Sequence, residues 1–200
     1  MRNNRISQSF YLNPDTLLIA QQLLGKKLIS NINNNITGGI IVEVEAYLGI
    51  NDKASHAYNN RLTKRTKTMY KRGGVSYIYL CYGIHYLFNI VTNIKNVPHA
   101  VLVRAIEPKV GISTMLKRRK LNIQNSRLTN GPAKLTQALG ITVEENSISL
   151  IEDRIWLEDC NFKIKQKDIL SSSRIGVDYA GDDANLPYRF YIKNNKWVSK

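Results

Sequence analysis

Apolar and polar residues alternate in several stretches of the chain, and this period of two predicts β-strands. The clearest stretch runs from Gly38 to Leu48, where β-branched residues alternate with glutamates. Residues 76–81 and 84–91 alternate in the same way on either side of Tyr82 and Gly83, which indicates a hairpin. Further strands are expected at residues 100–106, where Glu107-Pro108 ends the stretch, and around residues 154–158 and 188–192.

Helix signals begin near the N-terminus. Asn13 is expected to cap a helix that has Pro14 and Asp15 in its first turn and that stops at Gly25. The residues expected on the apolar side of this helix are Leu17, Leu18, Gln21 and Leu24.

The remaining pattern gives the organisation of the chain. Two more helices are expected, at residues 109–119 and 132–139, and the polar, basic residues 51–73 predict a long loop. Residues 1–10 are expected to be a flexible N-terminus, and residues 11–200 to form a single domain. Because most strands follow one another closely, the prediction is an α+β domain around a largely antiparallel sheet.

Composition excludes several classes of protein. No run of about 18 apolar residues is present, so no membrane-spanning helix is expected. The start of the chain does not resemble a secretory signal. Cys81 and Cys160 form no metal-spaced cluster with the histidines at 56, 85 and 99, so we expect no metal site and two free thiols in a reducing cytoplasm.

Charge is distributed unevenly. The net charge is +14, and residues 53–143 hold sixteen Lys and Arg residues but a single carboxylate, Glu107. The rest of the chain holds thirteen cations and fourteen acids. A segment so poor in acids favours a polyanionic partner, most simply the phosphates of a nucleic acid. A membrane surface is the other partner that charge alone allows.

Glu43 and Glu45 are candidate catalytic groups. On a strand they share one face with Tyr47, whereas Val42 and Val44 face the other side. The plain alternative is a solvated acidic face. However, a carboxylate beside bound DNA is repelled by phosphate, so its presence there suggests a catalytic function. Hydrolysis of a glycosidic bond is such a function, because a carboxylate can stabilise an oxocarbenium ion and take a proton from water. Spacing alone does not choose between the two glutamates.

Tyrosines are concentrated in the same region. Five lie within seventeen residues: Tyr70, Tyr77, Tyr79, Tyr82 and Tyr86. Tyr77 and Tyr79 share a strand face and are compatible with an aromatic core stripe. Tyr82 lies at the hairpin tip, where a large ring cannot be buried within its own domain, and this favours a wedge inserted between bases.

Other candidates are weaker. His56 is compatible with an ordinary loop histidine. Arg61 and Arg65 belong to a basic run with few acids nearby, which favours phosphate contacts. Lys134 lies at the start of a predicted helix, where a phosphate can bind. Arg104 ends an apolar stretch and needs a partner, for which Glu45 and Glu107 are candidates.

Together these segments resemble the alkyladenine, or 3-methyladenine, DNA glycosylase family, the methylpurine glycosylases. The resemblance covers nearly the whole chain from Leu12 onward and rests on the order of its blocks. The blocks are Glu43-Val44-Glu45-Ala46-Tyr47-Leu48-Gly49 followed by His56, Tyr77-Ile78-Tyr79-Leu80-Cys81-Tyr82-Gly83 followed by Asn89, Val101 to Pro108, Gly131-Pro132-Ala133-Lys134-Leu135, Ser173-Arg174-Ile175-Gly176-Val177, and Arg189-Phe190-Tyr191.

The resemblance implies a role for each site residue. Glu45 matches the residue that activates water, with Arg104 and the backbone carbonyl of Ile175 as the other groups that hold this water. Tyr82 matches the tyrosine of a protruding DNA-intercalating β-hairpin, and Ile84 and His85 follow it along the minor groove. The residues that match the base-binding pocket are Tyr47, His56 and Tyr79 as its aromatic walls and Asn89 as its floor.

The implied activity is monofunctional base excision without a cofactor. We expect a monomeric enzyme, bacterial in type, that works in the cytoplasm on nucleoid DNA. It would flip alkylated or deaminated purines from duplex DNA and leave an abasic site. Two alternatives stay open, a non-catalytic nucleic-acid-binding module of the same fold and an RNA-directed module.

Overall fold

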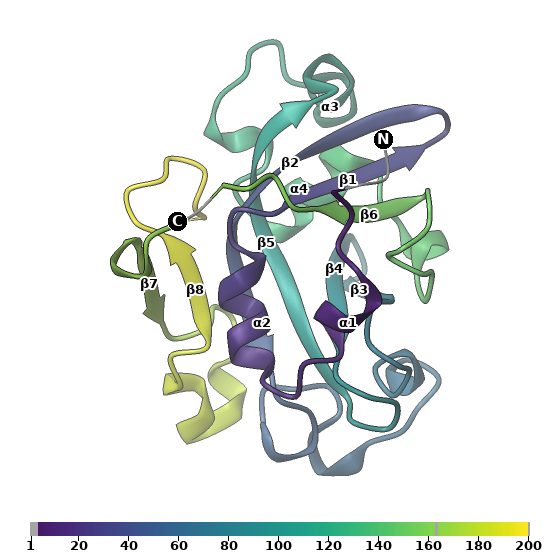
Figure 1. The fold of residues 1–200 in the computed structure, drawn as a ribbon, viewed down its shortest axis with the longest axis vertical. Coiled ribbons are helices and arrows are strands. Elements are labelled where there is room, and N and C mark those ends of the chain that lie inside the picture. Colours follow the sequence, from purple (N-terminus) through teal and green to yellow (C-terminus); the bar gives the residue numbers. More distant parts are fainter. Residues whose placement is uncertain (1–3, 163, 200) are drawn as a thin grey trace.

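An eight-stranded antiparallel sheet forms the body of the computed structural model, which describes residues 4–162 and 164–199 (Figure 1). Its main path runs in the order β3-β4-β5-β2-β1-β6, and β8 joins it beside β2 and carries β7. The strands are β1 (Lys27–Ile32), β2 (Asn35–Tyr47), β3 (Ser76–Cys81), β4 (His85–Thr92), β5 (His99–Val110), β6 (Ile155–Glu158), β7 (Ile169–Ser172) and β8 (Arg189–Ile192).

The long strand β2 organises the sheet. One of its edges pairs with β5, and the other pairs first with β1, through residues 35–40, and then with β8, through residues 43–45. Register shifts between Ile41 and Val44 mark the region where β2 passes from one partner to the other. As a result, the stretch that carries Glu43 and Glu45 lies between β5 and β8.

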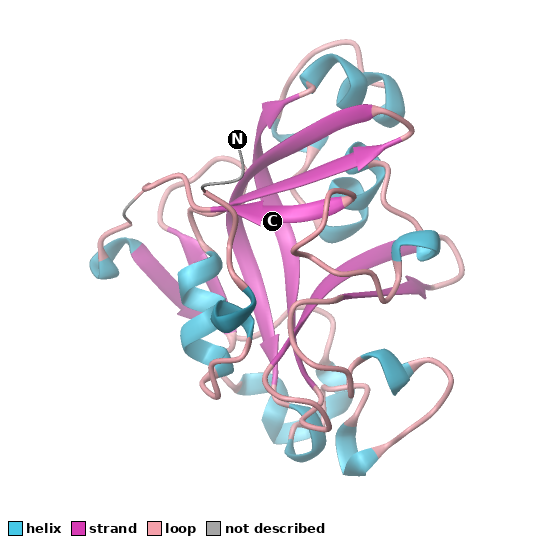
Figure 2. Cartoon of the chain, turned by 45° about the vertical axis from the view of Figure 1, so that its right-hand side comes forward, coloured by secondary structure: helices cyan, strands magenta, loops and turns pink. Residues whose placement is uncertain are grey.

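Within the described residues, four short α-helices pack around the sheet, and Figure 2 colours them cyan together with the 3-10 turns. They are α1 (Gln8–Tyr11), α2 (Thr16–Leu23), α3 (Ile112–Arg119) and α4 (Pro132–Leu139). The bounds predicted for α4 are confirmed, and Gly140 ends the helix with a φ of 73°, in the left-handed region that favours glycine. Among the described residues, no helix is long and apolar enough to cross a membrane.

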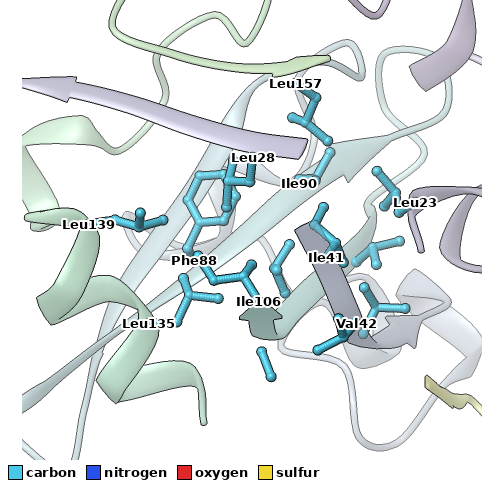
Figure 3. Packing of buried hydrophobic residues seen from close by; sticks show 14 of the residues in the cluster. Leu23, Leu28, Ile41, Val42, Phe88, Ile90, Ile106, Leu135, Leu139 and Leu157 are labelled. Carbon is cyan, nitrogen blue, oxygen red and sulfur yellow. The ribbon is translucent and has the colours of Figure 1, made fainter. Parts of the chain in front are cut away.

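The main hydrophobic core lies between the sheet and the helices (Figure 3). Leu23 of α2 and Leu135 and Leu139 of α4 converge there on buried side chains of the strands. The strand residues labelled in Figure 3 are Leu28, Ile41, Val42, Phe88, Ile90, Ile106 and Leu157. Val42, Val44 and Ala46 all belong to this core, so the opposite face of β2 is left for Glu43, Glu45 and Tyr47.

The prediction for helix α2 was wrong in its start and in part of its buried face, although Leu17 and Leu24 do contact the core as expected. Asp15, not Asn13, is the N-cap, and its carboxylate accepts the Leu18 amide at 2.9 Å. The helix buries Thr16, Ile19, Ala20 and Leu23, whereas Leu18 is exposed. Apolar residues occur on both sides of this short helix, so its own pattern could not show which side the sheet would cover.

The predicted end of β5 was also wrong. The strand continues through Pro108 to Val110, and α3 consequently begins at Ile112 instead of residue 109. Gly39 of β2 lies opposite Pro108, and a Cβ atom on this glycine would come within 2.3 Å of the Glu107 carbonyl oxygen. The glycine therefore allows the two backbones to approach where a proline interrupts the hydrogen bonding.

The strands and the N-terminal segment differ in part from the expectations. The structure adds two strands that the pattern does not predict, β1 and β7. Within the N-terminal segment that we expected to be flexible, Ile6 is buried and Arg5 pairs with Asp153 at 2.6 Å. Residues 1–3 of that segment lie outside the described residues.

Candidate active site

A cavity of about 270 Å³ opens between β2, the β3–β4 hairpin, β5 and the loop after β7. Pro132 and Ala133 at the start of α4 form part of its wall. Most of the predicted site residues contribute to the lining, namely Tyr47, His56, Tyr79, Tyr82, His85, Asn89, Arg104 and Ile175. Glu45, Ile84, Arg61, Arg65 and Lys134 do not line it.

Glu45 lies directly behind the cavity wall and is fully buried. Its Oε1 atom is 3.0 Å from a guanidinium nitrogen of Arg104 and accepts the backbone N–H of Ile175 at 2.8 Å. Its Oε2 atom accepts the hydroxyl of Tyr47 at 2.8 Å. All three partners line the cavity. Glu45 is thus separated from the cavity only by the groups that bind it.

Glu43 is equally buried but meets other partners. It accepts hydrogen bonds from Arg104 at 2.9 Å and from Arg189 at 2.7 Å. The backbone and hydroxyl of Ser199 donate to it as well, at 2.6 and 2.7 Å. These contacts take up its acceptor capacity with donors from β5, from β8 and from Ser199. A solvated acidic face, the plain alternative for this strand, is therefore excluded.

Arg104 joins the two carboxylates. It reaches Glu43 through Nε and Glu45 through a terminal nitrogen, whereas Glu107 pairs with Lys109. Of the two partners suggested by the sequence, Glu45 is right and Glu107 is wrong. Burial alone would lower the pKa of Arg104, but its attraction to Glu45 and Glu43 outweighs this and raises it.

Aromatic rings make up much of the cavity wall. His56 lies edge-on to Tyr79 at 4.6 Å between centroids, and its Nδ1 is 2.8 Å from the Tyr77 hydroxyl. Burial, with a contribution from Arg65 and Arg61, lowers the pKa of His56 to about 4. The histidine ring is therefore neutral at physiological pH. Burial also raises the pKa of Tyr47 and Tyr79, which keeps their hydroxyls protonated.

Asn89 is buried and lines the same cavity. Its amide nitrogen donates to the backbone carbonyl of Tyr77 at 3.0 Å and is 3.4 Å from that of Leu87. These two contacts fix the side chain between β3 and β4. A rigid amide at this place restricts the shapes that can enter.

Comparison with known proteins now decides the family. A sequence profile described as methylpurine-DNA glycosylase matches residues 9–196. The chain belongs to the methylpurine-DNA glycosylase family. This membership makes it a DNA N-glycosylase, a hydrolase of base excision repair.

Curated relatives named "Putative 3-methyladenine DNA glycosylase" agree with this assignment. One from Chlamydia felis is 47% identical over 96% of this chain and 97% of its own length. Another, from Clostridium perfringens strain 13, is 44% identical over 98% and 99%. A third, from Bacillus cytotoxicus, is 42% identical over 93% and 95%. The relatives therefore match the glycosylase over nearly its whole length.

The β3–β4 hairpin of the glycosylase ends in an exposed aromatic residue. Tyr82 is 89% exposed, and its φ of 51° lies in the left-handed region that a tyrosine rarely adopts. Ile84 beside it is 71% exposed, and His85 is exposed at the start of β4. The tip therefore presents apolar and aromatic surface next to the cavity. Tyr82 and His85 also line the cavity.

The predicted phosphate-contacting residues of the glycosylase are in different situations. Arg61 is exposed in a groove that shares His56 and Tyr179 with the cavity. The guanidinium of Arg65 lies 4.6 Å from the centre of the Tyr79 ring and 3.4 Å from His56 Nε2, so it packs on the aromatic wall. The ammonium group of Lys134 is held by Asn130 within its own helix start, at 2.9 Å from the side-chain oxygen.

Several residues near the site had no predicted role. Asp52 and Arg174 form a buried ion pair behind Tyr47, Arg189 holds Glu43, and Tyr179 lines the cavity. Two sequence signals could have pointed to the pair. Asp52 is the last acid before the acid-poor segment, and Arg174 lies in the Ser173–Val177 block. Among the described residues, no group of three or more His, Cys, Asp or Glu is placed to hold a metal ion.

Proposed function

We propose that this glycosylase flips alkylated or deaminated purines out of duplex DNA and hydrolyses their N-glycosidic bond with a water activated by Glu45. The substrate class would be 3-methyladenine, 7-methylguanine, hypoxanthine and ethenoadenine. The observation that carries the proposal is the buried Glu45 carboxylate, held by Arg104, Tyr47 and Ile175 at the wall of an aromatic cavity.

The aromatic walls would bind the flipped base. Alkylated purines carry a positive charge, and the rings of Tyr47 and Tyr79 attract a stacked cation through their π-electrons. His56 suits this role because its lowered pKa keeps it uncharged. Asn89, held by the carbonyl of Tyr77, would form the cavity floor and obstruct the 2-amino group of normal guanine.

Chemistry would then follow at the sugar. As the glycosidic bond breaks, its electron pair leaves with the purine, and the sugar gains oxocarbenium character that the Glu45 carboxylate stabilises. Water adds to C1′ and gives a proton to Glu45. Arg104 and the backbone carbonyl of Ile175 would hold this water.

A monofunctional reaction is proposed because no lysine is present among the described residues that line the cavity. A Schiff base with the sugar needs such an amine. The product would be an abasic site in an uncut strand. We propose that the enzyme acts as a monomer, in the cytoplasm and on nucleoid DNA.

The hairpin would hold the DNA open during this reaction. Tyr82 would fill the gap that the flipped nucleotide leaves, and Ile84 and His85 would follow the minor groove. Arg61, Arg65 and Lys134 would contact phosphates. For Arg65 this requires its guanidinium to leave the ring of Tyr79 when DNA binds.

Duplex oligonucleotides with a single ethenoadenine, hypoxanthine or 3-methyladenine test the proposal. Incubation followed by alkali should cut the lesion strand, and the same sample without alkali should stay intact. Glu45→Gln should bind the lesion duplex but lower the single-turnover rate by at least about a thousandfold. Glu107→Gln, on the neighbouring strand and outside the cavity, should excise at the wild-type rate.

Three outcomes would contradict the proposal. If no lesion yields an abasic site while the duplex is bound, the chain is a non-catalytic binder. If Glu45→Gln turns over like the wild type, another group activates the water. Preference for single-stranded RNA over lesion duplex would support the RNA-directed alternative.

A further inference from the structure

The buried ion pair of Asp52 and Arg174 lies directly behind the wall of the cavity. The guanidinium donates to both carboxylate oxygens of Asp52, at 2.5 and 2.8 Å. It also donates to the backbone carbonyls of Ala46 at 2.9 Å and Asp183 at 3.1 Å. Asp52 in turn accepts the amide of Leu48 at 3.0 Å. The pair thus fixes the end of β2 against two loops.

The same guanidinium stacks on Tyr47. The central carbon of Arg174 is 4.8 Å from the centre of the Tyr47 ring and 5.3 Å from that of Tyr188. Arg174 is buried and does not line the cavity, whereas Tyr47 does. The guanidinium therefore covers the side of the Tyr47 ring that faces away from the cavity.

A positive charge at this place would oppose the binding of a cationic base. A base stacked on the cavity side of Tyr47 would lie about 8 Å from the guanidinium, where one uncompensated charge changes relative binding about tenfold or more. Asp52 supplies the compensating negative charge through a bidentate contact. The other buried charges beside Tyr47 also balance, because Arg104 and Arg189 are matched by Glu43 and Glu45.

We propose that Asp52 and Arg174 are specificity-determining residues that keep the back of Tyr47 electrically neutral, so that a positively charged purine can stack on its front. This inference rests on the proposed function, since it assigns the pair a part in selecting the charge of the base. The pair acts through Tyr47 and touches no reacting atom.

Two single variants leave opposite charges behind the ring. Asp52→Asn leaves the guanidinium uncompensated, and Arg174→Gln leaves the carboxylate uncompensated. The measured quantity is the ratio of the single-turnover excision rates for 7-methylguanine, which is cationic, and hypoxanthine, which is neutral. We expect Asp52→Asn to lower this ratio about tenfold and Arg174→Gln to raise it by a similar factor.

The double variant Asp52→Asn/Arg174→Gln restores neutrality. Its ratio should return to within about threefold of the wild type, even where both rates are lower. Arg118→Gln is the matched structural control, because Arg118 also holds two backbone carbonyls, those of Ile32 and Ala138, but lies outside the cavity. It should leave the ratio unchanged. A purely structural role for the pair would lower both rates together.

Removal of one partner from a buried pair can prevent folding. If a single variant does not fold, the comparison moves to Asp52→Asn/Arg174→Lys against Asp52→Asn/Arg174→Gln, which differ by one charge. The lysine form should show the lower ratio. Equal ratios in all folded variants, or single variants that shift the ratio in the same direction, would overturn the inference. Absence of excision by the wild type would instead contradict the proposed function.

Discussion

Two glutamates on one face of β2, only two residues apart, meet different surroundings. Glu43 binds Arg104, Arg189 and Ser199, which together saturate its oxygens. Glu45 binds Arg104 and two groups that belong to the cavity wall. For single residues, which of two similar glutamates lies at the cavity wall depends on partners that are distant in sequence. Periodicity could place both glutamates on one face but could not separate them.

His56 gives a residue-scale prediction for stability. Its pKa is about 4 in the folded protein and 6.5 as the ordinary value, so between these pH values the unfolded chain binds a proton that the folded chain does not. The free energy of unfolding should therefore fall as the pH is lowered from about 6.5 to about 4, and this loss should be smaller in His56→Gln.

Urea unfolding at pH 7, 6 and 5 measures this effect. His85→Gln, which changes an exposed histidine at the hairpin, provides the control and should behave as the wild type. If the wild type and His56→Gln lose stability in parallel between pH 7 and pH 5, the histidine is not held neutral by its surroundings.

Among the elements, the β3–β4 hairpin separates its two sets of residues most clearly. Its strands carry the cavity residues Tyr79 and Asn89 on one side, and its tip carries Tyr82. Tyr77 has two roles of its own, because it is buried in a small hydrophobic cluster and also lines the cavity. One hairpin thus connects the surface that would meet DNA with the pocket that would receive the base.

Tyr82→Ala tests the role of the tip. If the ring fills the gap left by a flipped nucleotide, the variant should weaken binding to lesion duplex about tenfold or more and leave binding to the same lesion in a single strand nearly unchanged. Fluorescence anisotropy with both substrates measures this difference. Leu62→Ala, another exposed apolar residue in the basic loop, is the control. Equal losses on both substrates would argue against a wedge.

The sequence predicts elements well where signals are local. Pro132 and Gly140 define α4, and Tyr82 with Gly83 marks the hairpin. Strand β1 is harder to predict, because its buried Ser30 is satisfied by Thr37 and by the carbonyl of Leu139, 109 residues away. Such a strand shows no simple alternation. Its existence depends on contacts that only the folded sheet provides.

For the whole molecule, positive charge falls into two classes. Arg104, Arg118 and Arg119 bind carboxylates or backbone carbonyls of the protein itself. Lys67 and Lys71, in contrast, are exposed in the basic loop. The net charge of a sequence segment therefore overstates what a partner meets. The segment predicted a basic surface but not which cations remain available on it.

The exposed cations should make DNA binding depend on salt concentration. The logarithm of the binding constant for DNA should fall linearly with the logarithm of salt concentration, with a slope of about −0.9 for each phosphate contact. Lys67→Gln/Lys71→Gln should reduce the steepness of that slope by up to about two such contacts. Lys193→Gln, exposed beyond the end of β8, should not. A flat response in the wild type would contradict an electrostatic mode of binding.

The left-handed backbone of Tyr82 has a consequence for directed evolution. A tyrosine in this conformation costs the free protein on the order of 1–2 kcal/mol, whereas glycine adopts it without strain. Selection for heat resistance alone should therefore enrich Tyr82→Gly early. Selection for survival under an alkylating agent should remove the same change. The two screens would select opposite residues at position 82 and would reveal a trade-off between thermal stability and repair activity there.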